Sequence, residues 1–597
     1  MGFLSNLRND FGYVRTIKGI LKLVKDVDSE STNLVPDDIE RSVDIFANNL
    51  AFMAEGQEWT YREFDNYANQ VAHWALAHGC TKGDTVAVFV RNRLEYVALW
   101  FGLAKIGVIP ALINYQLRAK ALAHCINISS AKLAIIDCEL SKDWNSAAEF
   151  LEGDVKAFGA FGTCKGLADF DNDVSGQSTD RPARSHREGI KGKDTFMKMF
   201  TSGTTGLPKA AKVAHTRGQY YLRGFCVPAK ATFKDRIMMV LPLYHATGGL
   251  CGVGIALTKG GAVIVSRKFS VSGFWDEVAQ TEATIFMYVG ELCRFLLNAG
   301  AHPKERTHKL RCIVGNGLSK DVWEEFITRF NIADVVEFYG ATEGNISLMN
   351  FDGPPGAVGR IPEFLRAKMN GDLIRYDVET GTHIKGPDGL YMRTEVGEIG
   401  ELVGEIRKGE TRFRYDGYED KEASDKKILH NVLKKDDMWF RTGDLLWRDE
   451  RGYYFFADRI GDTYRWKAEN VSTGEVAAAM SAFDGVHQAN VYGVEIPGYD
   501  GRAGMASLVA DKDLDLKKLH AHICDALPAY AQPVFLRISD ETETTSTFKF
   551  KKTNLVKDGF DPARVKDMLF VNHPEKKSYE KLGKVLYKKI QNCELKF

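Results

Sequence analysis

A run of hydroxyl side chains, glycines and one lysine follows a hydrophobic segment in the first half of the chain. Residues 196–200 lead into the sequence Thr201-Ser202-Gly203-Thr204-Thr205-Gly206-Leu207-Pro208-Lys209. Glycines let backbone N–H groups approach a polyanion, the hydroxyls add rotatable donors, and the lysine adds a positive charge. The spacing differs from the Walker type, because no Ser or Thr follows the lysine. We therefore predict a phosphate-binding loop and disfavour the alternative, a flexible surface turn.

A second group of functional side chains leaves the end of a predicted strand at 335–339. Tyr339, Thr342 and Glu343 follow one another in the segment YGATEG. Ligands of open α/β sheets bind at the carboxyl ends of strands. Glu343 supplies the hard oxygen that Mg²⁺ prefers, Thr342 can donate to a phosphate, and Tyr339 offers an aromatic face to a purine. The alternative is a turn that contains a buried tyrosine.

Three further segments fit the same chemistry, although each is a weak signal by itself. Asp444 ends the segment RTGD and can accept hydrogen bonds from ribose hydroxyls. Arg459 and Arg465 lie in a charged connector and can contact phosphates bidentately. Lys549 lies in the lysine-rich run 545–552, whose spacing alone indicates no more than a solvated basic face.

Short buried-type strands alternate with helical stretches along most of the chain. A capping-box pattern at 60–63 predicts a helix over 60–78, and a second helix is predicted at 95–106. Such alternation predicts parallel sheets covered by helices. The polar segment 171–194 is predicted to be a loop. Strands are predicted at 85–90, 133–136, 236–240, 262–266, 284–289, 311–314 and 335–339.

The length of 597 residues predicts several domains. The predicted fold class is α/β, with a large N-terminal domain of helix-covered mixed or parallel sheets and a small mobile α+β C-terminal domain. A glycine inside the charged connector is a suitable hinge. Helices at 475–483 and 516–527 and strands at 489–494 and 506–509 are predicted beyond it. The predicted parts are an amphipathic segment 1–40, a large domain 41–458, a hinge 459–465 and a small domain 466–597.

Composition excludes several classes of protein. The net charge is +0, with 79 basic and 79 acidic residues, which argues against nucleic acid as the main partner. None of the ten cysteines forms a C-x-x-C pair, so we predict neither a zinc site nor a disulfide framework, and we expect reduced thiols.

The sequence predicts no transmembrane helix and no secretory signal. The most apolar stretch, 97–114, is interrupted by Lys105 and Pro110, and Asn6 breaks the myristoylation pattern. Residues 11–27 place apolar side chains at helical spacing between basic ones. This segment predicts either an interfacial helix on anionic lipid or a helix docked on the body of the protein. The expected location is the cytoplasm or the cytosolic face of a membrane.

Taken together, the motifs resemble those of one superfamily. The phosphate loop, YGATEG (339–344), RTGD (441–444), DRIGD (458–462) and TFK (547–549) resemble, in order and separation, the motifs of adenylate-forming enzymes. This superfamily includes acyl-CoA synthetases, firefly luciferase and nonribosomal adenylation domains, and the resemblance covers nearly the whole chain. Longer phrases narrow it to the fatty acid transport protein branch of long- and very-long-chain acyl-CoA synthetases. They include DRIGDTYRW at 458–466, ENVS at 469–472 and GFDP at 559–562.

The resemblance implies an ATP- and Mg²⁺-dependent fatty acid–CoA ligase, whose partners are a long- or very-long-chain fatty acid, ATP and coenzyme A. A fatty acid carboxylate would attack the α-phosphate of ATP, giving acyl-AMP and pyrophosphate. The thiol of coenzyme A would then displace AMP. Because two anions meet in the first step, positive charge and N–H donors should converge there.

The resemblance also assigns roles to the motif residues of the large domain. Thr204 and Glu343 would hold Mg²⁺, and residues 201–209 would grip the β- and γ-phosphates. Tyr339 would stack on adenine, and Thr342 would contact the α-phosphate.

In the later motifs, Asp444 would hold the ribose, and Arg459 would contact ribose or phosphate. Lys549 would bridge the carboxylate and the α-phosphate in the first step only, before the small domain swings about the connector. Two departures from the family pattern occur here. Ala468 stands where the branch has a glycine beside the pantetheine path, which makes the thioester step less secure than adenylation, and Ser546 replaces a glycine next to TFK.

Candidate acyl-site residues come from three segments. His245 occupies a position where the family has a residue bordering the acyl site, although a lone histidine is as often structural. Residues 284–297, which include Tyr288, are predicted to line an acyl tunnel, with plain core as the alternative. Gly315 completes this set.

Two rival functions stay open at the level of sequence. One is a CoA ligase for another bulky apolar acid, such as a steroid side-chain acid, because an apolar tunnel does not identify its ligand. The other is a membrane-associated fatty acid uptake protein with weak catalysis. The sequence also leaves a monomer and a homodimer both open.

Overall fold

The computed structural model describes residues 3–201, 207–378, 380–467, 469–499, 501–541 and 552–597. The chain folds into two compact units, and each contains two segments of the sequence. Unit 1 comprises Met1–Pro362 and Gly404–Leu429, and unit 2 comprises Glu363–Val403 and His430–Phe597. The hinge predicted at 459–465 stays a prediction.

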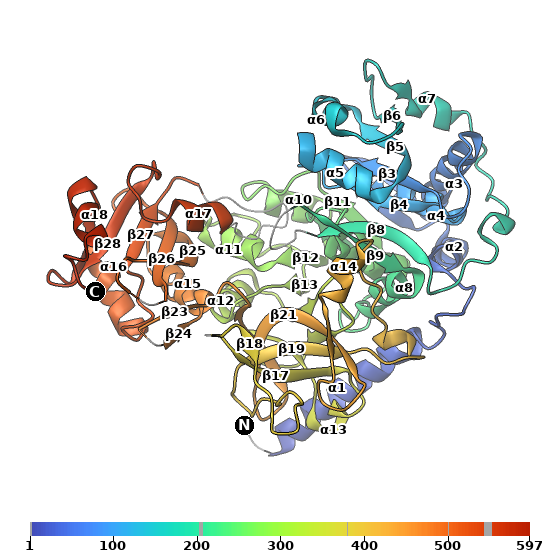
Figure 1. Cartoon of the computed structure of the whole chain (residues 1–597). Helices are drawn as coiled ribbons and strands as arrows, with labels where there is room; N and C mark the ends of the chain where they lie inside the picture. The colour runs from blue at the N-terminus through green and yellow to red at the C-terminus, as the bar shows by residue number, and fades with distance from the viewer. Residues whose placement is uncertain (1–2, 202–206, 379, 468, 500, 542–551) are drawn as a thin grey trace. The chain divides into compact units, whose positions relative to one another are not determined.

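The first sheet of unit 1 has the strand order β7-β6-β5-β3-β4-β8-β9 (Figure 1). Its strands from β7 to β8 are parallel, and the edge strand β9 pairs with β8 in antiparallel fashion, with Thr201 opposite Lys209. The two ends of the predicted phosphate loop are therefore held side by side. The strands are β3 (Thr85–Phe89), β4 (Ile109–Leu112), β5 (Ala131–Asp137), β6 (Lys156–Ala160), β7 (Ala168–Asp169), β8 (Thr195–Thr201) and β9 (Lys209–Ala214).

The second sheet of unit 1 has the order β15-β14-β13-β12-β10-β11-β1-β2. Its six inner strands are parallel, and the edge strands β2 and β15 are antiparallel to their neighbours. The strands predicted for this region are confirmed to within one or two residues. They are β1 (Leu50–Ala54), β2 (Gln57–Thr60), β10 (Arg236–Met239), β11 (Ala262–Val265), β12 (Ile285–Val289), β13 (Cys312–Asn316), β14 (Asp334–Gly340) and β15 (Ser347–Asn350), and β16 (Ala357–Arg360) follows them.

Helices cover these sheets, and the predicted capping box is confirmed at the start of α3. The Glu63 N–H donates to Thr60 Oγ1, and the Thr60 N–H donates to Glu63 Oε2 at 2.7 Å. The helices of unit 1 are α1 (Phe3–Leu23), α2 (Val35–Phe46), α3 (Tyr61–Ala77), α4 (Tyr96–Lys105), α5 (Ala119–Ser129), α6 (Ser141–Ala147), α7 (Phe170–Ser175), α8 (His215–Gly224), α9 (Val253–Leu257), α10 (Phe274–Gln280), α11 (Gly290–Asn298), α12 (Lys320–Phe330) and α14 (Lys421–Asp425).

Unit 2 contains a β-sheet region, a short hairpin and an α+β region with its own core. In the α+β region, α15 and α16 pack on a five-stranded sheet, β25-β26-β27-β28-β29, drawn in orange to red in Figure 1. The strands are β17 (Gly371–Asp377), β18 (Thr382–His383), β19 (Gly400–Glu405), β20 (Ile428–His430), β21 (Met438–Arg448), β22 (Tyr453–Arg459), β23 (Tyr464–Trp466), β24 (Glu469–Val471), β25 (Val486–Val494), β26 (Ala503–Ala510), β27 (Phe535–Ile538), β28 (Met568–His573) and β29 (Ser578–Lys581). The helices are α13 (Glu363–Arg366), α15 (Thr473–Ser481), α16 (Leu516–Ala526), α17 (Thr553–Asp558) and α18 (Lys584–Gln591).

Two expectations from the sequence are wrong. Cys138 and Cys164 form a disulfide. Each cysteine follows one of the parallel neighbours β5 and β6, whose ends lie at the same edge of the sheet. The other eight cysteines are free thiols. The segment 171–194 is also not a plain loop, since most of α7 (Phe170–Ser175) and a 3₁₀ helix at Arg184–Arg187 lie within it. The Asp169 side chain caps this helix, and its apolar face is buried through Phe170 and Val174.

Helix α1 and the residues after it pack on unit 1 through part of the predicted apolar face, since Val24 is buried and Val14 and Ile17 are half-buried. Tyr13 is buried, donates to the Arg360 carbonyl at 2.7 Å and stacks on Phe351. Phe11 and Leu21, by contrast, are 78% and 42% exposed. One face of α1 is therefore docked on the body of unit 1, as the second alternative predicted, and the other face is exposed. Across the described ranges, no helix is both long and apolar enough to span a bilayer.

Candidate active site

Helix α8 holds the loop that carries Thr342 and Glu343. The Arg217 guanidinium donates to the backbone carbonyl of Gly344 and, at 3.4 Å, to that of Thr342. The Tyr221 hydroxyl donates to the carbonyls of Ala341 and Thr342, both at 3.3 Å. Backbone carbonyls in a turn need such partners when water has little access to them. The loop is therefore fixed by side chains from another element.

Arg217 is itself anchored, because it is buried and pairs with Asp416 at 3.1 Å. It also donates to the Arg414 carbonyl at 3.1 Å. A buried guanidinium needs a paired charge and acceptors for its remaining N–H groups. Arg217 has both, and it joins the carboxylate loop to the segment around Asp416.

Tyr418 links the two nucleotide motifs of unit 1. Its hydroxyl donates to Glu343 Oε1 at 2.7 Å, and it also shares a hydrogen bond with the Thr201 side chain. The Lys209 ammonium lies 5.7 Å from the centroid of the Tyr418 ring. Burial, followed by the negative charge of Glu343, raises the pKa of Tyr418 far above its usual range. The structure thus brings Thr201, Lys209 and Glu343 around one tyrosine.

Two further parts of the predicted nucleotide site are Tyr339 and the middle of the phosphate loop. Tyr339 is half-buried near the end of β14, opposite Leu348 of β15. Ser202, Gly203, Thr204, Thr205 and Gly206 lie outside the described residues.

The candidate acyl residues fall into two groups. Tyr288 of β12 and Gly315 of β13 are register partners, and Tyr288 is fully buried. His245 belongs to a separate turn that leads into a π-helix at Thr247–Gly252, and its ring lies 4.5 Å from that of Tyr244, centroid to centroid.

In unit 2, Asp444 and Arg459 face each other across β21 and β22. Their side chains form an ion pair at 3.0 Å, and Asp444 is buried. Behind them, Glu401 accepts from the Gly443 N–H at 2.9 Å and pairs with Arg441 at 3.3 Å. These contacts hold the RTGD segment, which lies within β21.

His383 also supports the RTGD segment of β21, by contacting Glu401. His383 Nε2 lies 2.6 Å from Glu401 Oε2. Burial alone would raise the pKa of Glu401, but the hydrogen bond from His383 and the charge of Arg441 lower it. Glu401 is therefore a buried carboxylate that keeps its charge next to the predicted ribose site.

The connector is tied to the element that follows it. Asp458 accepts from the Thr473 N–H at 2.8 Å and from its hydroxyl at 3.0 Å. Lys552 donates to Asp462 at 3.1 Å and to Thr473 Oγ1 at 2.9 Å. Arg465 lies in β23, and its carbonyl accepts from the Arg502 N–H at 2.7 Å. Lys549, Ala468 and Ser546 lie outside the described residues.

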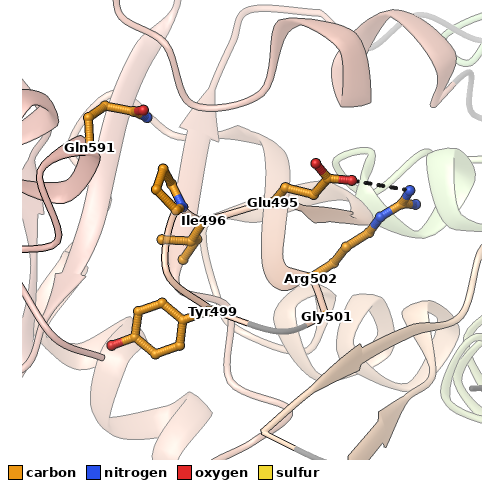
Figure 2. Close-up of a pocket in the computed structure, with 7 residues that line it drawn as sticks. Glu495, Ile496, Tyr499, Gly501, Arg502 and Gln591 are labelled. Atoms are coloured by element: carbon orange, nitrogen blue, oxygen red, sulfur yellow. Dashed lines mark ion pairs between the residues drawn. The ribbon is translucent and has the colours of Figure 1, made fainter.

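A cavity of about 630 Å³ lies in unit 2, beside the β23 hairpin (Figure 2). Glu495 and Arg502 form an ion pair at 3.7 Å at this cavity, and Gly501 bridges to Trp466. Of the predicted site residues that the structure describes, none lines it. The lining residues are Glu495, Ile496, Pro497, Tyr499, Gly501, Arg502 and Gln591.

Two family models match the sequence. The AMP-binding enzyme family matches residues 39–403, and the AMP-binding enzyme C-terminal domain matches residues 475–549. The chain belongs to the AMP-binding enzyme family. This AMP-binding enzyme is 39% identical over 549 residues to long-chain fatty acid transport protein 6 of Mus musculus, covering 91% of this chain and 88% of the relative.

A second relative and a solved structure are also similar to this chain over most of its length. Long-chain fatty acid transport protein 1 of Rattus norvegicus is 40% identical over 529 residues, covering 87% of this chain and 81% of the relative. The anthranilate CoA ligase in complex with anthranoyl-AMP superposes with a TM-score of 0.75 at 22% identity, covering 89% of this chain and 98% of that one. The predicted fold class is confirmed, and this AMP-binding enzyme has close homologues among the long-chain fatty acid transport proteins.

Sequence reasoning missed the residues that support the motifs. Arg217 and Tyr221 lie on a helix with no motif of its own, and Tyr418 is remote in sequence from Glu343, to which it donates. The one usable signal was the segment around Asp416 and Tyr418, where acidic and aromatic residues flank a glycine.

Proposed function

We propose that this AMP-binding enzyme is an ATP-dependent, AMP-forming fatty acid–CoA ligase for long or very long chains. The observation that carries the proposal is the Glu343–Tyr418 contact, because it places a carboxylate beside Thr201 and Lys209 of the phosphate-loop strands. Anionic and cationic groups that converge at the end of a sheet suit a metal-bound polyphosphate. The long-chain fatty acid transport protein relatives support the choice of acid.

The reaction has two steps. A carboxylate oxygen of the acid forms a bond to the α-phosphorus of ATP, and the bond from that phosphorus to pyrophosphate breaks. The sulfur of coenzyme A then bonds to the acyl carbon, AMP leaves with the former bridging oxygen, and the thiol proton passes to solvent. Lys209 and the N–H groups of the loop would offset the negative charge that gathers in the first step.

Glu343 fits a Mg²⁺ ligand. One of its oxygens accepts from Tyr418, and a carboxylate offers further lone pairs on both oxygens. Mg²⁺ takes few protein ligands when substrate phosphates supply the others. We propose that Glu343 and Thr204 hold the ion, which would polarise the phosphoryl oxygens when bound.

The remaining motif residues take the roles that the family motifs suggest. Tyr339 would stack on adenine, and Thr342 would contact the α-phosphate. Asp444, paired with Arg459, would hold the ribose hydroxyls. Arg465 is proposed to contact phosphate.

Lys549 is proposed to act in adenylation alone. Lys549→Ala should abolish acyl-AMP formation and leave thioester formation from supplied acyl-AMP intact. Equal loss of both half-reactions would contradict this role.

The proposal is tested by exchange of labelled pyrophosphate into ATP. Purified enzyme should catalyse exchange only when a fatty acid is present. Exchange with a steroid side-chain acid but not with fatty acids would favour the rival ligase. Fatty acid binding without exchange for any acid would favour an uptake protein.

We also propose that helix α1 contacts an anionic membrane surface. Its outward face combines the exposed Phe11 with Arg15, Lys18 and Lys22, all exposed at helical spacing. Such a face binds lipid through apolar insertion and attraction to anionic headgroups. Sedimentation with phosphatidylserine vesicles, but not with neutral ones, is expected, and Phe11→Ser should weaken it. Equal sedimentation with both vesicles, or none, would contradict the proposal.

A further inference from the structure

A short segment of unit 1, residues 417–419, pairs with β9 at the edge of the first sheet. The Gly417 carbonyl accepts from an N–H of β9 at 3.1 Å, and the Glu419 N–H donates to a carbonyl of β9 at 3.0 Å. Between these two bonds, Tyr418 is the antiparallel partner of Ala211. Backbone hydrogen bonds therefore join the segment that carries Tyr418 to the strand that follows the phosphate loop.

The two faces of this strand pair differ in what they contact. Successive side chains of a strand point to opposite faces of a sheet. The register places Tyr418 on the same face as Thr201 and Lys209. Its hydroxyl reaches Glu343 there. Glu419 points to the opposite face, which α5 covers.

Lys198 of β8 contacts Glu419 on the α5 face. Its ammonium lies 3.0 Å from Glu419 Oε1 and donates to the Ser129 carbonyl at 2.9 Å. Ser129 is the last residue of α5, where a cation offsets the negative end of the helix dipole. The side chain of Lys198 is 8% exposed and that of Glu419 is 36% exposed. A lysine so deeply buried needs a paired charge, and Glu419 supplies it.

The neighbouring strand increases this need for a carboxylate. Lys212 of β9 is the register partner of Lys198, so both side chains lie on the α5 face. Like charges directly opposite each other in an antiparallel pair repel. The negative charge of Glu419 offsets this repulsion when the carboxylate lies next to Lys198.

The ion pair also specifies the register of residues 417–419. A strand that slips by one residue turns every side chain to the other face of the sheet. Such a slip would turn Tyr418 away from Glu343 and would move the Glu419 carboxylate away from Lys198. The two side-chain contacts therefore favour the same register from opposite faces.

We propose that Lys198 is a positioning residue, whose ion pair with Glu419 fixes the register of residues 417–419 and so keeps the Tyr418 hydroxyl on Glu343. The inference rests on the proposed function, in which Glu343 is a ligand of the metal. Lys198 acts through Tyr418, from the face of the sheet opposite the one that Tyr418 faces.

The first test measures kcat for fatty-acid-dependent pyrophosphate exchange in a double-mutant cycle. Lys198→Met and Glu419→Ala should each lower kcat about fivefold, which corresponds to the loss of one modest ion pair. In a Tyr418→Phe background, the same two substitutions should change kcat by less than about twofold, because the hydroxyl through which they act is absent. Glu419→Gln keeps an acceptor for Lys198 and should retain most of the rate.

The second test requires neither nucleotide nor metal. Amide hydrogen exchange at Glu419 should become about tenfold faster in Lys198→Met, because the segment opens more often when only its backbone bonds hold it. Lys426→Met is the matched control. It removes an exposed lysine that pairs with Glu422 at 2.6 Å in α14, and it should leave both kcat and amide exchange unchanged.

An unaltered kcat in Glu419→Ala would overturn the inference, and this variant decides even if Lys198→Met fails to fold, because Glu419 is partly exposed. Losses that multiply in full with the loss in Tyr418→Phe would also overturn it, since they would mean a general effect on folding. Wild type that exchanges no pyrophosphate with any acid would instead contradict the proposed function. In that case, unchanged amide exchange in Lys198→Met would still contradict the role of Lys198.

Discussion

Glu337 and Glu343 lie on one strand and the loop that follows it, yet their surroundings differ in kind. Glu337 is buried, accepts from two backbone N–H groups and a tyrosine, and has a pKa raised to about 8. Glu343 is half-buried and accepts from Tyr418. Burial therefore separates a carboxyl that supports the fold from inside the core from one that lies partly open to solvent, where a bound ligand could reach it.

The largest expected effect comes from removing the support of the Glu343 loop. Arg217→Met should lower the free energy of unfolding by about 3 kcal/mol, because the buried Asp416 loses Arg217 and is left with the partly exposed Arg414, 3.0 Å away. Thermal unfolding measures this loss. A double variant, Arg217→Met with Asp416→Leu, should recover part of it, since the buried carboxylate is then removed and the charge left on Arg414 is partly exposed. A fully stable Arg217→Met would show that the loop needs no such anchor.

The second prediction compares the same substitution at the two carboxyls, Glu343 and Glu337. Glu343→Gln should reduce fatty-acid-dependent pyrophosphate exchange about a hundredfold or more, because a neutral amide is a weak Mg²⁺ ligand. Glu337→Gln should leave the exchange rate at saturating acid within about twofold. Exchange assays at high Mg²⁺ distinguish the two. Similar losses in both variants would remove the distinction between them.

The third prediction concerns the contact that joins the nucleotide motifs. Tyr418→Phe keeps the ring beside Lys209 but removes the donor to Glu343. We expect kcat for exchange to fall about tenfold, in line with the loss of one positioning hydrogen bond to a charged group. Tyr221→Phe should lower kcat less, because Tyr221 supports the same loop through backbone carbonyls and does not donate to Glu343. An unchanged kcat in Tyr418→Phe would mean that the contact does not position Glu343.

The smallest expected effect is a pH dependence of stability. The pKa of Glu337 is raised in the folded state, so its stabilising contribution is complete below the unfolded pKa near 4.5 and is lost as pH rises through about 8. Between about pH 7 and 8, wild type should lose about 1 kcal/mol relative to Glu337→Gln. Denaturant midpoints at the two pH values measure the difference. Parallel pH profiles for the two proteins would show that Glu337 is ionised throughout.

The sequence predicted most strands of unit 1 well, because each depends on local pattern. The capping box at Thr60 lies where the sequence predicted it, whereas the antiparallel pairing of Thr201 with Lys209 was not predicted. The supporting contacts depend on which segments meet in space, and spacing does not encode that. Tyr418 reaches Glu343, and Cys138 reaches Cys164, only through the arrangement of strands.

The exposed side of α1 shows the same limit. Helical periodicity identified an amphipathic helix, but the docked face was set by Tyr13, which contacts Phe351 and Arg360 far along the chain. The roles of Thr204, Asp444 and Lys549 stay predictions.

The most direct test of the central claim is exchange of labelled pyrophosphate into ATP by purified, folded protein with Mg²⁺ and a long-chain fatty acid. We expect exchange that requires the fatty acid and is nearly absent in Glu343→Gln. Folded wild-type protein that exchanges no label, whichever fatty acid is supplied, would contradict it.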